Sequence, residues 1–203
     1  MTLFKNKYRI ESNRLAGWNY ANAGIYFITL VIQHRACILG RVTDGIMHLS
    51  DFGQIVDAEF YRSFSLREEL ILHEYILMPN HLHVLVEIVS VDLPIVPLYP
   101  VETQGPASLR DIMEQPKNYG IAIRQPKSIS TFVAGFKSGT TNKIDDYIDE
   151  NHLEWPKYNR QNKLWQPNYH DHIVRDKQSY WRIRNYIKYN PQKWRNDCFN
   201  NAD

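Results

Sequence analysis

The alternation of apolar and polar positions divides the chain into short strand-like and helix-like segments. Residues 24–33 (GIYFITLVIQ) are rich in β-branched and aromatic side chains, which is typical of a strand. In residues 51–64, Val56, Phe60 and Phe64 recur every four positions, which is the spacing of one helix face. This pattern predicts a strand followed by a helix.

The next two apolar segments predict a hairpin. Residues 68–79 and 81–88 both have the composition of strands. Pro79 ends the first segment, and Asn80 separates it from the second. Proline followed or preceded by asparagine is a turn signal, so the two strands are expected to be neighbours in a sheet.

Residues 89–127 differ from the rest of the chain because prolines interrupt any period. We interpret them as a proline-rich insertion, with at most one helical turn around residues 107–114. The length of 203 residues suits one domain, so residues 1–203 are expected to form a single domain that carries this insertion.

The C-terminal part returns to regular patterns. Residues 128–148 have helical spacing and begin with a serine, a common helix cap. Residues 163–176 predict a strand with an irregular start, and residues 176–190 a helix capped by its aspartate and ended by a proline. Helices on a small, mostly antiparallel sheet give an α+β sandwich, of the ferredoxin-like or RRM-like kind.

Two histidines open the strand at residues 81–88 (HLHVLVEI). Side chains alternate along a strand, so His81 and His83 share one face, while the apolar residues between and after them share the other. Two imidazoles at this spacing can bind one divalent ion, each through one ring nitrogen. The alternative is a surface strand whose polar face carries two histidines, and the pair alone does not decide.

A tyrosine and an asparagine lie near the end of the last predicted helix. Tyr186 and Asn190 are four residues apart, on one flank of the apolar stripe marked by Ile183 and Ile187. From that edge the hydroxyl of Tyr186 could enter a cleft, and the amide oxygen of Asn190 could bind a metal. The alternatives are a tyrosine at the rim of the core and an asparagine that ends the helix before Pro191.

Composition narrows the classes of function. The net charge is only +2, so any site for nucleic acid must be a local basic patch. Cys37 and Cys198 are far apart and lack CxxC spacing, which disfavours a disulfide framework or a cysteine zinc site. The N-terminus lacks the apolar region of a signal peptide, and no apolar run approaches the length of a membrane span, so a soluble cytoplasmic protein is expected.

Four segments together are more specific than any one of them. They are RLAGWNYANAGIYFITL, MPNHLHVLV, FVAGFKSGTTNKI and LWQPNYHDHIVRD…YWRIRNYIKYNPQKW. Their order over residues 8–195 resembles the single-tyrosine HUH transposases, in particular the REP-associated tyrosine transposase (RAYT) group. In that family the second segment corresponds to the histidine–hydrophobe–histidine metal motif, the third to the FKS helix and the fourth to a WQ…HxIR…YIxxNP block.

The resemblance implies a role for each candidate site residue. His81 and His83 would be metal ligands, with Asn190 as the third where related transposases often have glutamine. The cofactor would be a divalent metal, Mg²⁺ or Mn²⁺, which neutralises a phosphate oxygen. Tyr186 would attack single-stranded DNA, form a 5′-phosphotyrosine and release a 3′-hydroxyl, and reversal of this step would join strands without ATP.

The implied partner is a palindromic, hairpin-forming DNA repeat with a short single-stranded guide, and the protein would be nucleoid-associated when bound to it. A monomer and a homodimer are both compatible with the sequence. DNA-binding candidates are Lys137, Arg14, His172 and Arg182. Lys137 lies in the FKS signature, and His172 lies at the histidine of HxIR. For each of them, a solvated charge or a packed ring is the alternative.

Two other functions stay open. One is a domesticated protein that binds repeat hairpins without cutting them. The other is a metal phosphoesterase that acts on small nucleotides. Separately, His170 and His172 form a second HxH, the motif that a two-histidine phosphoesterase would carry twice. Such enzymes normally carry serine or threonine after each pair, which neither motif here has, so His170 is interpreted as incidental.

Overall fold

The centre of the molecule is a four-stranded antiparallel sheet. The computed structural model describes residues 3–4, 7–8, 15, 17–89 and 127–200. The sheet consists of β3 (Gly24–Val31), β6 (Leu70–Leu77), β7 (His81–Ile88) and β8 (His170–Val174), in the spatial order β6-β7-β3-β8. Every neighbouring pair is antiparallel.

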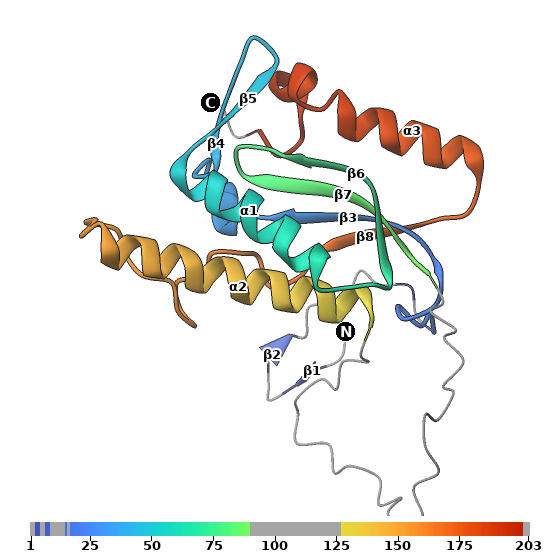
Figure 1. The fold of residues 1–203 in the computed structure, drawn as a ribbon, viewed down its shortest axis with the longest axis horizontal. Helices are drawn as coiled ribbons and strands as arrows, with labels where there is room; N and C mark the ends of the chain where they lie inside the picture. The colour runs from blue at the N-terminus through green and yellow to red at the C-terminus, as the bar shows by residue number, and fades with distance from the viewer. Residues whose placement is uncertain (1–2, 5–6, 9–14, 16, 90–126, 201–203) are drawn as a thin grey trace, which may run out of the picture.

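Three helices cover the two faces of this sheet (Figure 1). They are α1 (Asp51–Ser65) between β3 and β6, α2 (Ile129–Glu150) between β7 and β8, and α3 (Lys177–Lys188) after β8. The strands of this sheet and the two helices between them follow in the order βαββαβ, so the predicted α+β, ferredoxin-like sandwich is confirmed. The helices α1 and α2 pack on one face, and α3 packs on the other along β6 and β7.

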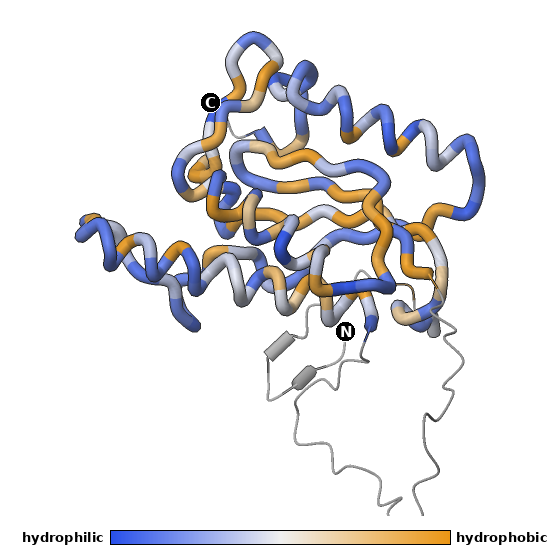
Figure 2. The backbone as a smooth tube through the Cα atoms, viewed as in Figure 1, coloured by the Kyte–Doolittle hydropathy of each residue, from blue (hydrophilic) through white to orange (hydrophobic). Residues whose placement is uncertain are grey.

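The two faces differ in what they bury. The main core joins α1 and α2 to the sheet through apolar residues such as Ile28, Phe60 and Phe136. Among the described residues, the buried members of the cluster under α3 are Leu85, Ile183 and Ile187. Figure 2 shows the same contrast, because the central strands are largely hydrophobic whereas α3 is mostly hydrophilic with a few apolar positions.

Each helix begins at a side-chain cap. The hydroxyls of Ser50 and Ser128 accept from the third backbone N–H of α1 and α2, and the carboxylate of Asp176 accepts from Ser179 N of α3. The caps predicted at the starts of α2 and α3 are therefore confirmed.

One hairpin was not predicted. β4 (Gly40–Thr43) and β5 (Ile46–Leu49) pair around Asp44 and Gly45, whose φ angles are 53° and 75°. Two consecutive positive φ angles make a type I′ turn, for which Asp-Gly is a favoured sequence. The signal was present in the sequence, in a segment too short to show a clear period.

Other differences lie at the ends of elements. The strand predicted over residues 163–176 is regular only at 170–174, and a short pair, β1 (Leu3–Phe4) with β2 (Lys7–Tyr8), was not predicted. Most of the proline-rich insertion, with the helical turn expected at residues 107–114, lies outside the described residues. Within the described ranges, no helix is long and apolar enough to cross a bilayer.

Candidate functional site

The two histidines of β7 are buried on the face that α3 covers. His81 and His83 are 0% and 1% exposed, and the β3 residues opposite them are Val31 and Thr29. The alternative of a surface strand with two exposed histidines is therefore wrong. Because a buried imidazole needs partners for both ring nitrogens, its neighbours define its chemistry.

Each imidazole is oriented through its Nδ1 atom. His81 Nδ1 lies 2.9 Å from Asn80 Oδ1, and His83 Nδ1 lies 2.8 Å from Thr29 Oγ1. The Nδ2 of Asn80 donates to the backbone carbonyls of Arg35 and Phe199, which fixes its Oδ1 toward His81. His81 therefore donates from Nδ1 and keeps a lone pair on Nε2.

The two Nε2 atoms converge, 3.1 Å apart. Burial lowers the pKa of His81 to about 4, and burial followed by the neighbouring His81 holds the pKa of His83 well below its usual range. Both rings are therefore neutral near pH 7. A threonine hydroxyl can donate or accept, so Thr29 suits either tautomer of His83. His83 can therefore carry its proton on Nδ1 and leave the lone pair of Nε2 free to bind a metal.

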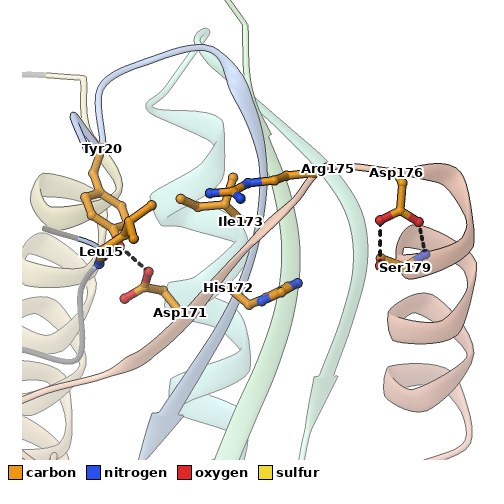
Figure 3. Close-up of a pocket in the computed structure, with 8 residues that line it drawn as sticks. All are labelled: Leu15, Tyr20, Asp171, His172, Ile173, Arg175, Asp176 and Ser179. Atoms are coloured by element: carbon orange, nitrogen blue, oxygen red, sulfur yellow. Dashed lines mark hydrogen bonds between the residues drawn. The ribbon is translucent and has the colours of Figure 1, made fainter. Parts of the chain in front are cut away.

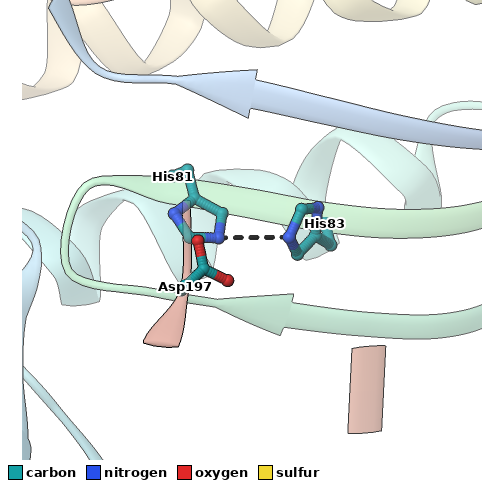
Figure 4. Close-up of side chains that lie close together, drawn as sticks. All are labelled: His81, His83 and Asp197. Carbon is teal, nitrogen blue, oxygen red and sulfur yellow. Dashed lines mark hydrogen bonds between the residues drawn. The ribbon is translucent and has the colours of Figure 1, made fainter. Parts of the chain in front are cut away.

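Asp197 lies beside the histidines, and Asn190 contacts Asp197. Asn190, just after α3, is 1% exposed, and its Oδ1 is buried without a hydrogen-bond partner, while its Nδ2 donates to Asp197 Oδ2 at 3.0 Å. Asp197 offers a carboxylate oxygen, and this atom and one ring nitrogen from each of His81 and His83 lie within 4.8 Å of one another (Figure 4).

These donors fit a divalent metal ion. Two neutral imidazoles with an amide oxygen and a carboxylate form a mixed nitrogen and oxygen set, which suits Mn²⁺ or a related ion. The unpartnered Oδ1 of Asn190 supports this fit, because a buried acceptor left without a donor or a cation is costly. Asp197 was missed by the sequence analysis. It lies beyond the last predicted helix, in a segment that carries no recognisable motif.

Tyr186 of α3 reaches the same cluster. Its Oη lies 3.2 Å from His83 Nε2, and its half-buried ring packs edge-on against Phe27. Burial, and after it the carboxylate of Asp197, raises the pKa of Tyr186 to about 12. The phenol of the last helix thus contacts one of the two convergent imidazoles of β7, while the roles of these residues stay predictions.

The structure describes three of the four predicted DNA-binding residues. Lys137 Nζ donates to the backbone carbonyls of Gln166 and Asn168, at 2.6 and 3.0 Å, so it holds the loop before β8. Arg182 is exposed on α3, one turn before Tyr186. Arg14 lies outside the described residues.

His172 is exposed on β8, opposite Phe27 of β3. It lines a pocket of about 380 Å³ (Figure 3), in which its side chain points toward α3 and Asp171 points toward Tyr20. The lining residues are Leu15, Tyr20, Asp171, His172, Ile173, Arg175, Asp176 and Ser179. His172 thus lies on the same face of the sheet as the histidine pair, beyond the strands that α3 covers.

No protein-family model matches the chain. An uncharacterized protein of Haemophilus influenzae is 29% identical over 192 residues, which cover 92% of this chain and 91% of that protein.

Two solved structures are similar at low identity. A REP-associated tyrosine transposase, solved bound to a REP hairpin, is 14% identical with a TM-score of 0.49, covering 96% of this chain and 74% of its own. A proposed transposase of Deinococcus radiodurans is 16% identical with a TM-score of 0.39, covering 86% and 95%. Because both identities are below 25% and both TM-scores are below 0.5, a function has to be argued from the geometry of the site.

Proposed function

We propose that the protein is a metal-dependent tyrosine DNA transposase of the REP-associated group, which cleaves and rejoins hairpin-flanked single-stranded DNA. The observation that supports this most directly is the position of Tyr186 Oη, 3.2 Å from the Nε2 of His83, which itself lies 3.1 Å from the Nε2 of His81. Metal-assisted phosphoryl transfer to a phenol requires the phenol to lie beside the residues that bind the metal.

His81 and His83 would hold the divalent ion, with the oxygens of Asn190 and Asp197 as further ligands. When bound, the ion supplies a positive charge against a non-bridging phosphate oxygen. Tyr186 Oη would then attack the phosphorus, the bond to the 3′-oxygen would break, and the phenol proton would end on the released 3′-hydroxyl. The reverse attack by a 3′-hydroxyl frees the phenol and joins two strands.

The electrostatics of Tyr186 favour its protonated form. With a pKa raised to about 12, its phenol keeps its proton near neutral pH. Because Asp197 contributes to that rise, a cation bound between Asp197 and the imidazoles would reduce it. Deprotonation would therefore be coupled to loading of the site.

The test is covalent capture of DNA. Hairpins with single-stranded flanks, taken from the DNA on either side of the gene, are incubated with the protein and Mn²⁺. We expect an adduct that survives denaturation when the oligonucleotide is labelled at its 3′ end, and a free 3′-hydroxyl fragment when it is labelled at its 5′ end. Tyr186→Phe should abolish both, and Tyr189→Phe, which changes an exposed phenol at the end of the same helix, should keep them.

Absence of an adduct from the wild-type protein with every flanking sequence would contradict the transposase reaction. Tight hairpin binding that a chelator leaves unchanged, without cleavage, would instead identify a domesticated binding protein. Turnover of small nucleotides without a covalent link would identify a phosphoesterase.

A further inference from the structure

Strand β6 carries a β-bulge at its contact with α3. The register of β6 on β7 shifts between Leu72 and Glu74, so His73 is the extra residue of the bulge. Leu72 before the bulge and Tyr75 after it both pack against the main core. Strict alternation would place Glu74 on the same face as Leu72. The bulge instead turns both His73 and Glu74 toward α3.

Both residues of the bulge contact α3 through polar atoms. His73 Nδ1 lies 3.0 Å from Tyr180 Oη, and Arg184 Nε donates to Glu74 Oε2 at 3.0 Å. Tyr180 and Arg184 are four residues apart, so they lie on the same side of the helix, one turn from each other. Two adjacent side chains of β6 thus hold two successive turns of α3.

A residue of β7 orients the first of these contacts. His73 Nε2 lies 2.9 Å from Glu87 Oε2, and an ionised carboxylate only accepts hydrogen bonds. A neutral His73 that donates to Glu87 from Nε2 therefore accepts the hydroxyl hydrogen of Tyr180 at Nδ1. The direction of the Tyr180 hydroxyl is thus set from two strands of the sheet.

Directional contacts matter on this face because its apolar packing is sparse. The residues of α3 that are buried there are Ile183 and Ile187, and apolar contact is non-directional. Hydrogen bonds and ion pairs, by contrast, require defined positions of donor and acceptor. The side chains of these polar contacts are partly exposed, so they add little to the free energy of unfolding. Their main effect is on the rotation of α3 about its axis.

The rotation of α3 sets the direction of Tyr186, which follows Arg184 by two residues. The Oη of Tyr186 lies 3.2 Å from the Nε2 of His83. A misplacement of about 1 Å at a reacting group can reduce a rate about a hundredfold. A small rotation of the helix would therefore slow the attack by the phenol without unfolding the protein.

We propose that His73 and Glu74 are positioning residues for the nucleophile, because they hold Tyr180 and Arg184 so that Tyr186 faces the metal-ligand set. This inference rests on the proposed function. It assigns a part in the reaction to β6, a strand that supplies neither the nucleophile nor any of the proposed metal ligands.

The test separates the rate of the covalent step from binding and from folding. The rate of adduct formation is measured at saturating hairpin DNA and Mn²⁺, and the affinity for the same DNA is measured with a chelator present. We expect Tyr180→Phe and Glu74→Gln each to lower the rate about tenfold, the order of effect of a partial misplacement. Their DNA affinity and Tm should stay close to those of the wild type.

Two control variants change the same chemical groups outside these contacts. Tyr189→Phe removes an exposed phenol at the end of the same helix, and Glu68→Gln changes an exposed carboxylate just before β6. Both should keep the wild-type rate of adduct formation.

A reversed ion pair tests whether the contact itself is responsible. Glu74→Arg places two cations against each other and should lower the rate at least as much as Glu74→Gln. The double variant Glu74→Arg/Arg184→Glu restores a pair of opposite charges and should recover most of that loss. Hydrogen exchange followed by mass spectrometry gives a second measurement. Amides of α3 should exchange faster in the single variants, while those of α1 and α2 stay as in the wild type.

The outcomes separate this inference from the proposed function. Wild-type rates in Tyr180→Phe and Glu74→Gln overturn the positioning role and leave the transposase reaction standing. A loss of rate matched by an equal loss of folded protein or of DNA affinity also overturns it, because the residues would then serve the fold or binding. A folded double variant without recovery overturns the role of Glu74. Absence of any adduct from the wild type overturns the reaction and, with it, the positioning role.

Discussion

At the start of β7 the two faces of the strand are equally buried and chemically opposite. Leu82 and Val84 point toward α1 and α2 and are 0% exposed, while His81 and His83 point toward α3 and are 0% and 1% exposed. Burial therefore does not by itself identify a core position. The partners of the side chain decide whether it stabilises the fold or supplies chemistry.

The faces also differ in how much apolar surface supports them. Aromatic rings pack together under α1 and α2, with Phe60 and Tyr75 stacked at 3.9 Å between centroids. On the α3 face the rings of Phe27 and Tyr186, and those of Trp194 and Phe199 from the C-terminal segment, lie around the histidines. Neutral imidazoles and an unpartnered amide oxygen cost free energy to bury, so the larger core on the other face has to offset them.

The strongest test of whether the two faces are independent is a cavity created in the main core. Phe136 is 0% exposed and contacts Phe60, Phe132 and Trp165. We expect Phe136→Ala to lower the free energy of unfolding by about 3–5 kcal/mol, measured by urea denaturation. Leu66→Ala, at a 66% exposed position, should change it by less than about 0.5 kcal/mol.

If the division holds, the adduct yield per folded Phe136→Ala molecule should equal that of the wild type. A loss of adduct beyond the loss of folded protein would show that the faces are coupled.

Added metal should raise the thermal stability of the protein through the histidines on the α3 face. Saturation at about one hundred times the dissociation constant stabilises a protein by about 2.7 kcal/mol, or roughly 5–10 °C in Tm for a chain of this size. We expect Mn²⁺ to raise the Tm of the wild type by this order. The double variant His81→Leu/His83→Leu should not respond, and His48→Leu, on exposed β5, should respond like the wild type.

An equal rise in Tm for the double variant would place Mn²⁺ elsewhere on the protein. Differential scanning fluorimetry with and without chelator distinguishes the two results.

The sequence predicted which side chains share one face of a strand or one flank of a helix, because these positions follow from periodicity. Alternation in HLHVLVEI placed His81 and His83 on one face, and the four-residue spacing of Tyr186 and Asn190 placed them on one flank of α3. A period fixes the direction of a side chain within its own element, which is why these positions could be assigned from the sequence.

Positions that depend on tertiary folding were not predicted. Asp197 reaches the histidines only because the chain folds back after the turn at Pro191–Asn196, and no periodic signal spans that segment. The contact of Thr29 with His83 follows from the register of β3 on β7, which a single sequence does not give. The contacts of the Lys137 ammonium with two loop carbonyls are likewise not revealed by spacing on its helix, while its predicted role at DNA stays a prediction.

Titration of Tyr20, a member of the main core, should change the free energy of unfolding and leave the proposed DNA cleavage unchanged. The Oη of Tyr20 donates to Asp171, and burial followed by this hydrogen bond raises the pKa of Tyr20 to about 12. A raised pKa in the folded state contributes stability that is fully present below pH 10 and is lost as the pH rises toward 12. We expect Tyr20→Phe to cost about 1.5–3 kcal/mol at pH 8, the order of a hydrogen bond to a charged group.

The difference between Tyr20→Phe and the wild type should then shrink between pH 10 and 12, as followed by urea denaturation at each pH. Tyr189→Phe, at an exposed phenol, serves as the control and should show no such convergence. A difference that stays constant through this range would mean that the phenol–carboxylate hydrogen bond does not carry the effect.

The smallest effect we expect tests whether Asp197 belongs to the ligand set. Asp197→Asn keeps the shape of the side chain and one carbonyl oxygen but removes the charge beside the imidazoles. We expect Mn²⁺ to bind about tenfold more weakly, or about 1.4 kcal/mol, by calorimetric titration. Asp176→Asn, at the cap of α3, should leave the affinity unchanged.

The competing role for Asp197 is to hold the chain that follows α3. Its Oδ1 accepts from Phe199 N and its Oδ2 accepts from Asn190 Nδ2, so a structural aspartate would show its loss in the metal-free protein. Lower metal-free stability with unchanged Mn²⁺ affinity would assign Asp197 to the fold. Weaker Mn²⁺ binding with metal-free stability unchanged would assign it to the site, and so extend the chemical face of the sheet from β7 and α3 to the segment that folds back over them.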